Sequence, residues 1–455
     1  MLITELERAL LRDDEAADSE LILQELRRTI REAAQPMPRI GDAARRFFVP
    51  LEPFLTDGPT GHKRLGRLAR SSLEPIWEWI SRDLMPAEAT ALSEDIKRAL
   101  LAQDQLRVEQ LVRALHGRAI ERMSGALAGV QPNDKDRRRF SVQVGTPRAI
   151  EDVTTLVRVL AFRDLLAELA RRLPDHIRTF DRAEIDRAMA LFDTTWAENL
   201  PGDSRSQRGE LLLYGLILFA SRLAAPWQLI GIATRAAESD DAARIAATPY
   251  AVAVGIVLGE LEHMLGELRA ELKAGRPVGG LLKGLHDASR QFRTEINLSV
   301  DSAWSRQLAA IRSAASNLLT AEIETVPGRV RRLLRPPPAK EIVAGSRLDD
   351  IDVHEVAMRV ELVGACRLYA GELAVSEVTL RTYSDLTQYL ETGSKILLDA
   401  LRHAEDAECP FRRSQAEAAI RLCRIVFGAD YAGLLTKAAE VARQSAVVER
   451  KAARA

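Results

Sequence analysis

Two apolar runs, Leu211–Ala220 (LLLYGLILFA) and Tyr250–Gly259 (YAVAVGIVLG), form the most hydrophobic part of the chain and decide its fold. Each run is ten residues long, whereas a membrane-spanning helix needs about 20 mostly apolar residues. Arg222 lies two residues beyond the first run, and Glu260 directly follows the second. We therefore expect helices buried in the core of a water-soluble protein, and contact of residues 211–259 with a membrane is the disfavoured alternative.

Helical spacing of apolar residues continues on both sides of this core. In the region 103–130, one stripe contains Val108, Leu111, Val112, Leu115, Ala119, Met123 and Ala126. Residues 1–34 are predicted to be helical too, with Thr4 and Glu7 as a capping box. The one strand-like alternation is Phe140–Val144 (FSVQV), which follows a charged stretch, Gln131–Arg139, that is predicted to be a loop. The sequence predicts an all-α fold, an irregular multi-helix bundle or array of two to three helical subdomains.

Breaks in the helical pattern predict three regions along the chain. An N-terminal helical region covers 1–137, a central bundle with the apolar core covers 146–335, and a C-terminal helical bundle covers 349–455. Three consecutive prolines begin residues 336–349, the stretch best suited to be an inter-domain linker.

Composition limits the function classes. The net charge is −1 over 455 residues, so the general basic excess of a nucleic-acid-binding protein is missing. Three cysteines are too few for a disulfide framework in a chain of this length. The first residues, Met1–Glu5, lack a basic region and an apolar segment, which predicts no signal peptide. We expect a cytoplasmic location, and the preference for arginine over lysine is typical of GC-rich bacterial coding.

A first candidate metal site lies in Glu260–Glu271. Glu260 and His263 have the Glu-x-x-His spacing of carboxylate-bridged di-iron bundles, and Glu267 and Glu271 follow on the same helix face. Such a bundle needs a second Glu-x-x-His motif, which the sequence does not contain. The opposite face of the helix carries an apolar stripe of Val254, Leu258, Leu261, Leu265, Leu268 and Leu272. We therefore expect the acidic face and His263 to be solvated, and no cofactor to be bound.

A second candidate site combines His263, His286, Asp287 and Asp301. Their order resembles the His, His-Asp and Asp series of helical metal-dependent phosphohydrolases of the His-Asp type, and this resemblance implies a metal centre at these four residues. The match covers too little of the chain to assign it to that family, because short patterns of this kind arise by chance. We expect His286 and Asp287 to lie on a helix surface.

A basic cluster, RVRRLLR, directly precedes the three prolines and contains Arg329, Arg331, Arg332 and Arg335. It is the candidate interaction site, which could contact an anionic membrane surface or an acidic segment such as Glu405–Glu408. No aromatic residues alternate with these arginines, which disfavours stacking on nucleic-acid bases. The preferred interpretation is a solvated helix end.

Three functions follow as hypotheses. The first is a non-enzymatic interaction or scaffold protein of a bacterial-type cytoplasm, with an unidentified protein partner and no nucleic acid. The second is a metal-dependent helical hydrolase or oxidase that uses His263, His286 and Asp287. The third is a peripheral or pore-forming membrane protein that inserts residues 211–259.

Overall fold

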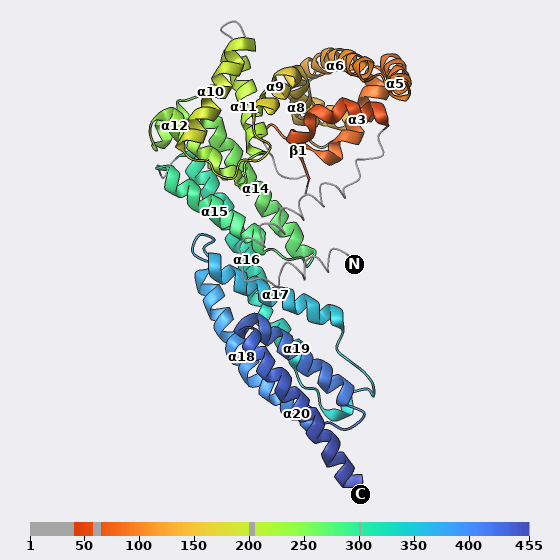
Figure 1. Cartoon of the computed structure of the whole chain (residues 1–455), viewed down its shortest axis with the longest axis vertical. Helices are drawn as coiled ribbons and strands as arrows, with labels where there is room; N and C mark the ends of the chain where they lie inside the picture. Colours follow the sequence, from red (N-terminus) through yellow and green to blue (C-terminus); the bar gives the residue numbers. More distant parts are fainter. Residues whose placement is uncertain (1–40, 58–64, 200–204, 300–301, 455) are drawn as a thin grey trace. The chain divides into compact units, whose positions relative to one another are not determined.

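The computed structural model describes residues 41–57, 65–199, 205–299 and 302–454. The predicted N-terminal helix, residues 1–34, and Asp301 lie outside these ranges. The fold is all-α, as predicted: helices dominate, and each of two strands is two residues long. The chain divides into two compact units, Met1–Gly259 and Glu260–Ala455 (Figure 1). The three-domain organisation stays a prediction.

The first unit is built from short and medium helices around one pair of strands. The strands β1 (Leu55–Thr56) and β2 (Leu68–Ala69) are parallel, with Leu55 opposite Leu68. The helical elements are α3 (Asp42–Phe48), η1 (Val49–Phe54), η2 (Arg70–Ser72), α4 (Leu73–Glu78), η3 (Trp79–Leu84), α5 (Pro86–Leu101), α6 (Gln105–Ala128), α7 (Asp134–Val144), α8 (Ala149–Ala161), α9 (Arg163–Arg172), α10 (Arg182–Asn199), α11 (Arg205–Ala220), η4 (Pro226–Leu229), α12 (Ile230–Ala237), α13 (Ala242–Ala246) and the N-terminal part of α14 (Ala251–Lys273).

The apolar part of α11, Leu211–Ala220, is buried on nearly all its sides, whereas Gln207–Gly209 in the first turns are exposed. Leu216, Ile217 and Leu218 are each at most 1% exposed, although they point in three different directions around the helix. A helix that is apolar all round belongs inside a protein. The second apolar run also packs internally. Gly255 and Gly259 of α14 lie against Leu65, within 4 Å of where their side chains would begin, so this glycine pair accommodates a neighbouring turn.

The predicted strand Phe140–Val144 is wrong, because these residues end helix α7. Asn133 caps the start of this helix by accepting a hydrogen bond from the Asp136 amide at 2.9 Å, and Gly145 ends it in the left-handed conformation at φ +81°. The helix buries Phe140 and Val144, one turn apart, and leaves Val142 83% exposed. The predicted loop at Gln131–Arg139 is likewise helical from Asp134 onward.

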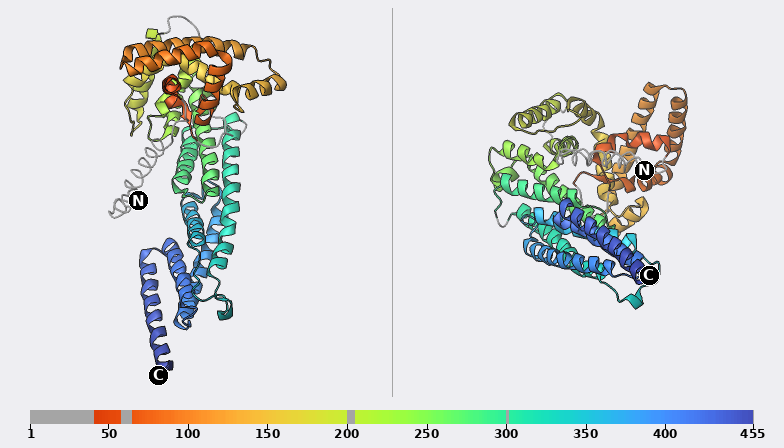
Figure 2. Two further views of the ribbon diagram at one scale, coloured as in Figure 1. Left: turned by 90° about the vertical axis from the view of Figure 1, so that its right-hand side faces the viewer. Right: turned by 60° about the horizontal axis from the view of Figure 1, so that its bottom comes forward.

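Helix α6 occupies one side of the first unit, beside α5 and α8 (Figure 2). Five residues of its predicted apolar stripe are buried, namely Val108, Leu111, Leu115, Ala119 and Met123. Val112 and Ala126 are only half-buried. The stripe is therefore confirmed as the packing face of α6, but one of its edges is not covered by a neighbouring helix.

The second unit is a bundle of long helices. After the end of α14 come α15 (Gly279–Glu295), α16 (Ala303–Leu334), η5 (Ala339–Glu341), α17 (Asp350–Tyr369), α18 (Ser376–Arg402), α19 (Cys409–Phe427) and α20 (Ala429–Arg454). Helices α18, α19 and α20 pack against one another, and α16 packs on α17 and α18 (Figure 1). Pro327 lies within α16 without ending it, so the helix continues for 32 residues.

The proline-rich stretch 336–349 lies within the second unit, where α19 holds it in place. Arg412 is 7% exposed and donates a hydrogen bond from Nη2 to the carbonyl oxygen of Pro337 at 2.8 Å. Gln415 donates from Nε2 to the carbonyl oxygen of Arg335 at 2.9 Å. At the other end, the Leu348 amide donates to Ser414 Oγ at 3.0 Å. These three side chains anchor the stretch as a strap across α19.

Candidate functional site

The histidine and acidic residues proposed for metal binding are engaged by other partners. Among the described residues, no three or more His, Cys, Asp or Glu side chains are grouped so that they could hold a metal ion. His286 packs on Tyr369, with ring centroids 5.2 Å apart. Asp287 accepts a hydrogen bond from Lys283 Nζ at 3.0 Å. Asp301, the fourth proposed ligand, lies outside the described residues.

The prediction that His263 is solvated is wrong. Its side chain is buried in α14, with Nε2 3.4 Å from Glu267 Oε1. Glu271 on the same face pairs with Arg276, whose Nη2 donates at 2.8 Å. The apolar stripe of α14 is buried as predicted from Val254 to Leu268. Because other parts of the protein also cover the polar face, both faces of this helix are largely removed from water.

The arginines of the basic cluster are divided between internal contacts and solvent. Arg329 donates from Nη1 to Glu355 Oε1 at 2.9 Å, and the guanidinium of Arg331 lies 5.9 Å from the ring centroid of Tyr389. Arg332 and Arg335 are exposed. Half of the cluster therefore joins helices of the second unit, and an interaction with an outside partner at these four residues stays a prediction.

Membrane insertion of residues 211–259 is the third hypothesis from the sequence. Within the ranges that the structure describes, no helix is both long enough and apolar enough to cross a bilayer.

The first unit contains a groove with a volume of about 590 Å³. Its walls come from α3, η1, α6 and α9, with Leu218 of α11 also lining it. This volume lies within the range of about 300–1,000 Å³ that is typical of ligand sites. The apolar lining residues are Val49, Pro50, Pro53, Phe54, Val108, Val112, Leu166, Ala167, Ala170 and Leu218.

Two helices each present one continuous face to this groove. On α6 the lining residues are Gln105, Val108, Glu109, Val112, Arg113 and His116, which follow the three- and four-residue spacing of a single helix face. On α9 they are Arg163, Asp164, Leu166, Ala167, Ala170 and Arg171, with the same spacing. The groove therefore follows the N-terminal half of α6 and nearly all of α9.

Arginine dominates the charged part of the lining. Arg46, Arg113, Arg163 and Arg171 are four cations, against the two carboxylates of Glu109 and Asp164. Asp164 is shared, since it lies 3.2 Å from Arg113 Nη2 and 3.6 Å from Arg163 Nη2. In the described part of the chain, no ion pair joins Arg46 to a carboxylate. Arg171 pairs with Glu168, a residue of the same helix just outside the lining. With that pair counted, the groove combines an apolar surface with a positive charge excess of one.

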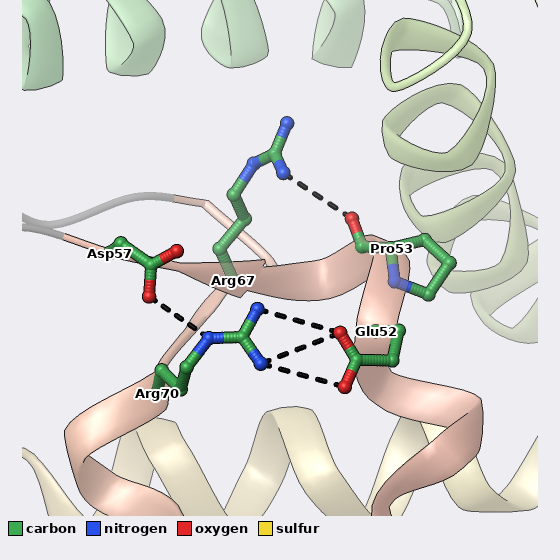
Figure 3. A network of polar contacts seen from close by, with 5 residues as sticks. All are labelled: Glu52, Pro53, Asp57, Arg67 and Arg70. Carbon is green, nitrogen blue, oxygen red and sulfur yellow. Dashed lines mark hydrogen bonds and ion pairs between the residues drawn. The ribbon is translucent and has the colours of Figure 1, made fainter. Parts of the chain in front are cut away.

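A polar network fixes η1, which forms one wall of the groove. Arg70 lies between two carboxylates, with Nε 2.9 Å from Asp57 Oδ1 and Nη2 3.4 Å from Glu52 Oε2 (Figure 3). Arg67 donates from Nη1 to the carbonyl oxygen of Pro53 at 3.3 Å (Figure 3). Pro53 itself lines the groove. The two arginines therefore hold the proline-rich η1 in position from the side of the strands.

His116 connects α6 to α3 at the groove. Its Nε2 lies 2.8 Å from the carbonyl oxygen of Phe47, to which it donates, and its ring contacts the Phe47 ring edge-on at 4.9 Å. The residue is 1% exposed. The pKa of His116 is lowered to about 4, chiefly by burial and also by the positive charge of nearby Arg163, while the hydrogen bond to Phe47 and the negative charge of Asp164 act in the opposite direction. At neutral pH the imidazole is therefore uncharged.

This depressed pKa predicts a loss of stability in mild acid. Between about pH 6.5 and pH 4 the unfolded chain binds a proton at His116 that the folded chain does not bind. The contribution of His116 is complete above pH 6.5, and as the pH falls to 4 the free energy of unfolding should decrease by about 3 kcal/mol, at 1.36 kcal/mol per pKa unit. Urea unfolding followed by circular dichroism at several pH values measures this decrease.

The His116→Gln variant serves as the control for this titration. A glutamine amide can still donate to the Phe47 carbonyl oxygen, but it does not titrate in this range. We expect its unfolding free energy to depend less on pH between 6.5 and 4 than that of the wild type. Equal pH dependence in the two proteins would show that other groups cause it.

Comparison with known proteins identifies no relative of this chain. The chain matches no protein-family model, and neither a curated protein nor a solved structure is significantly similar to it.

Proposed function

We propose that this protein is a non-enzymatic helical interaction protein whose α6–α9 groove binds an amphipathic, acidic helix of a partner protein. The observation that carries the proposal is the pair of continuous helix faces, from α6 and α9, that line one groove. A third helix laid between them would complete a local bundle, which is a common mode of peptide recognition.

The dimensions of the groove support a helix as the ligand. From Gln105 to His116, the lining face of α6 extends about 16 Å at a rise of 1.5 Å per residue. This length matches three turns of a bound helix. Apolar side chains spaced by three and four residues on that helix would lie against Val108, Val112 and Leu166.

The charges of the groove support an acidic partner. With the Arg171–Glu168 pair counted, the groove carries an excess of one positive charge, and Arg46 has no carboxylate partner among the described residues. Complementary charges at the rim of an interface set its specificity and accelerate association. Glutamate or aspartate residues beside the apolar stripe of the partner would pair with Arg46 and Arg113.

The proposal is tested by calorimetric titration with two synthetic helical peptides. Both carry leucine at every fourth position, and one has glutamate where the other has lysine. We expect the glutamate peptide to bind at least about tenfold more tightly. Reversing two charges in Arg46→Glu/Arg113→Glu should weaken its binding about tenfold or more, which equals about 1.4 kcal/mol or more.

A matched variant separates the groove from the general charge of the protein. Arg107 and Arg118 are exposed residues of α6 that do not line the groove. The variant Arg107→Glu/Arg118→Glu changes the net charge by the same amount, and we expect it to bind the glutamate peptide within about twofold of the wild type. Absence of peptide binding, together with binding of dodecanoate that depends on Arg46 and Arg113, would instead make the groove a small-molecule site.

A further inference from the structure

We infer that the α6–α9 groove accepts its partner helix in one direction only, antiparallel to α6. The amino-terminal half of the bound helix is acidic and lies over Arg46 and Arg113, and its carboxy-terminal half presents a lysine or arginine to Glu109. This inference rests on the proposed function and specifies the charge pattern that the partner must have.

The cations of the groove gather at one end of its axis, near His116. Asp164 Oδ1 lies 3.2 Å from Arg113 Nη2, and its Oδ2 lies 3.6 Å from Arg163 Nη2, so the three charges are close together. Arg46 is brought to the same end, because the residue after it accepts a hydrogen bond from His116 Nε2 at 2.8 Å. Three arginines and one carboxylate give this end of the groove a formal charge of +2.

The other end of the groove, near Gln105, is negative. Glu109 lies one helical turn before Arg113, which separates the two residues along α6 by about 6 Å. Glu109 forms no ion pair with any cation whose position the structure describes. Arg171, the remaining arginine of the lining, is paired with Glu168. The formal charge therefore changes from +2 to −1 along the axis of the groove.

The dipole of the bound helix selects its direction. Acidic side chains stabilise the amino-terminal turns of a helix, and basic side chains stabilise its carboxy-terminal turns. A partner with acidic residues first and a basic residue later is therefore a stable helix by itself. With its acidic half over Arg46 and Arg113, this helix runs from the His116 end toward the Gln105 end, opposite to α6. The reverse direction would place its acidic residues over Glu109.

Calorimetric titration with two acidic peptides of identical composition tests the charge order. Both carry leucine at every fourth position. The segregated peptide has its glutamates in the first half and its lysines in the second, whereas the alternating peptide has them mixed along its length. We expect the wild type to bind the segregated peptide about fivefold more tightly, an effect near the upper limit for one exposed charge pair.

An exchange of two residues on α6 tests whether the groove causes this preference. Glu109→Arg/Arg113→Glu keeps the composition and the net charge but reverses the charge order, so the preference for the segregated peptide should disappear. The matched control, Arg118→Glu/Glu121→Arg, exchanges two exposed residues of α6 outside the groove, and it should keep the fivefold preference. A preference that comes only from the helicity of the peptides would be the same in all three proteins, and this result would overturn the inference.

Photo-crosslinking measures the direction of the bound helix. A benzophenone group on the first residue of the segregated peptide should label the chain near His116, as mapped by mass spectrometry after proteolysis. Labelling near Gln105 instead would show that the helix lies in the reverse direction.

The titrations also separate this inference from the proposed function. If the wild type binds both peptides equally, the groove binds acidic helices without distinguishing their charge order, and only the inference is wrong. If the wild type binds neither the two peptides nor the all-glutamate peptide, the proposed function fails and the inference fails with it.

Discussion

The variant Arg412→Met is expected to destabilise the second unit by about 3–5 kcal/mol. The side chain of Arg412 is 8% exposed and that of its ion-pair partner Glu408 is 13% exposed, with Nε 3.5 Å from Oε2. Removing one member of a buried pair leaves the other charge without compensation, which costs about 3–5 kcal/mol. The carbonyl oxygen of Pro337 also loses its donor. Urea unfolding monitored by circular dichroism measures the change.

The adjacent residue provides the control for this substitution. Arg413 also pairs with a glutamate, Glu417, at 2.8 Å, but the two side chains are 57% and 61% exposed. Exposed pairs contribute about 0–1 kcal/mol, so Arg413→Met should have little effect. The expected local signature of Arg412→Met is faster hydrogen exchange in the strap, residues 336–349. Similar unfolding free energies for the two variants would show that burial of Arg412 does not determine its contribution.

The variant Gly66→Ala is expected to destabilise the first unit by about 2–5 kcal/mol. Gly66 has φ +65°, and a Cβ at this position would lie 2.6 Å from Ile217 Cδ1 and 3.2 Å from Leu213. The left-handed conformation costs a residue with a side chain about 1–2 kcal/mol, and overpacking adds about 1–3 kcal/mol. Ile217 is fully buried in α11, so its terminal methyl group has little room to move. The measurement is the urea midpoint of unfolding.

Gly275→Ala isolates the conformational part of this cost. Gly275 has a nearly identical φ of +64°, but a Cβ there would have no neighbour within 4 Å. We expect this variant to lose only the backbone contribution of about 1–2 kcal/mol. If Gly66→Ala costs no more than Gly275→Ala, then the core around Ile217 accommodates a methyl group by rearrangement.

Local periodicity was sufficient to predict the fold class and much of the core. The run Leu211–Ala220 predicted a buried helix because its apolar residues surround the helix axis. The stripe of α14 was correct from Val254 to Leu268. The same pattern led to the wrong prediction that His263 is solvated. A polar face shows which side of a helix is less apolar, but it does not show whether that side is exposed to water. Whether a neighbouring segment covers that side depends on contacts distant in sequence.

The Phe140–Val144 error has a local cause. In a five-residue stretch, residues at positions one and five lie on the same side of a strand and of a helix. The apolar middle residue, Val142, favoured the strand, yet it is exposed in the helix. The end signals, Asn133 and Gly145, were the better evidence, because capping residues fix where a helix starts and stops.

The groove could not be predicted because its walls come from three separate parts of the sequence. Helical spacing identified the stripe of α6, and it included Val112 in the core. No property of that stripe indicates that α9 lies opposite with Arg163 and Asp164. The sequence offered one signal for a groove. Val108 and Val112 are followed directly by Glu109 and Arg113, so charged residues border the apolar stripe of α6 on one side. His116, at the edge of the same stripe, is 1% exposed.

The uneven distribution of aromatic residues has a consequence for spectroscopy. Trp79 is fully buried in the first unit, with Phe140 edge-on against it at 5.6 Å. The second unit has a single tryptophan, Trp304 in α16. The other four of the chain's five indoles, all in the first unit, are Trp77, Trp79, Trp196 and Trp227. Intrinsic emission will therefore report mainly on melting of the first unit. A single transition in the tryptophan fluorescence would therefore contain little information about whether the second unit has unfolded.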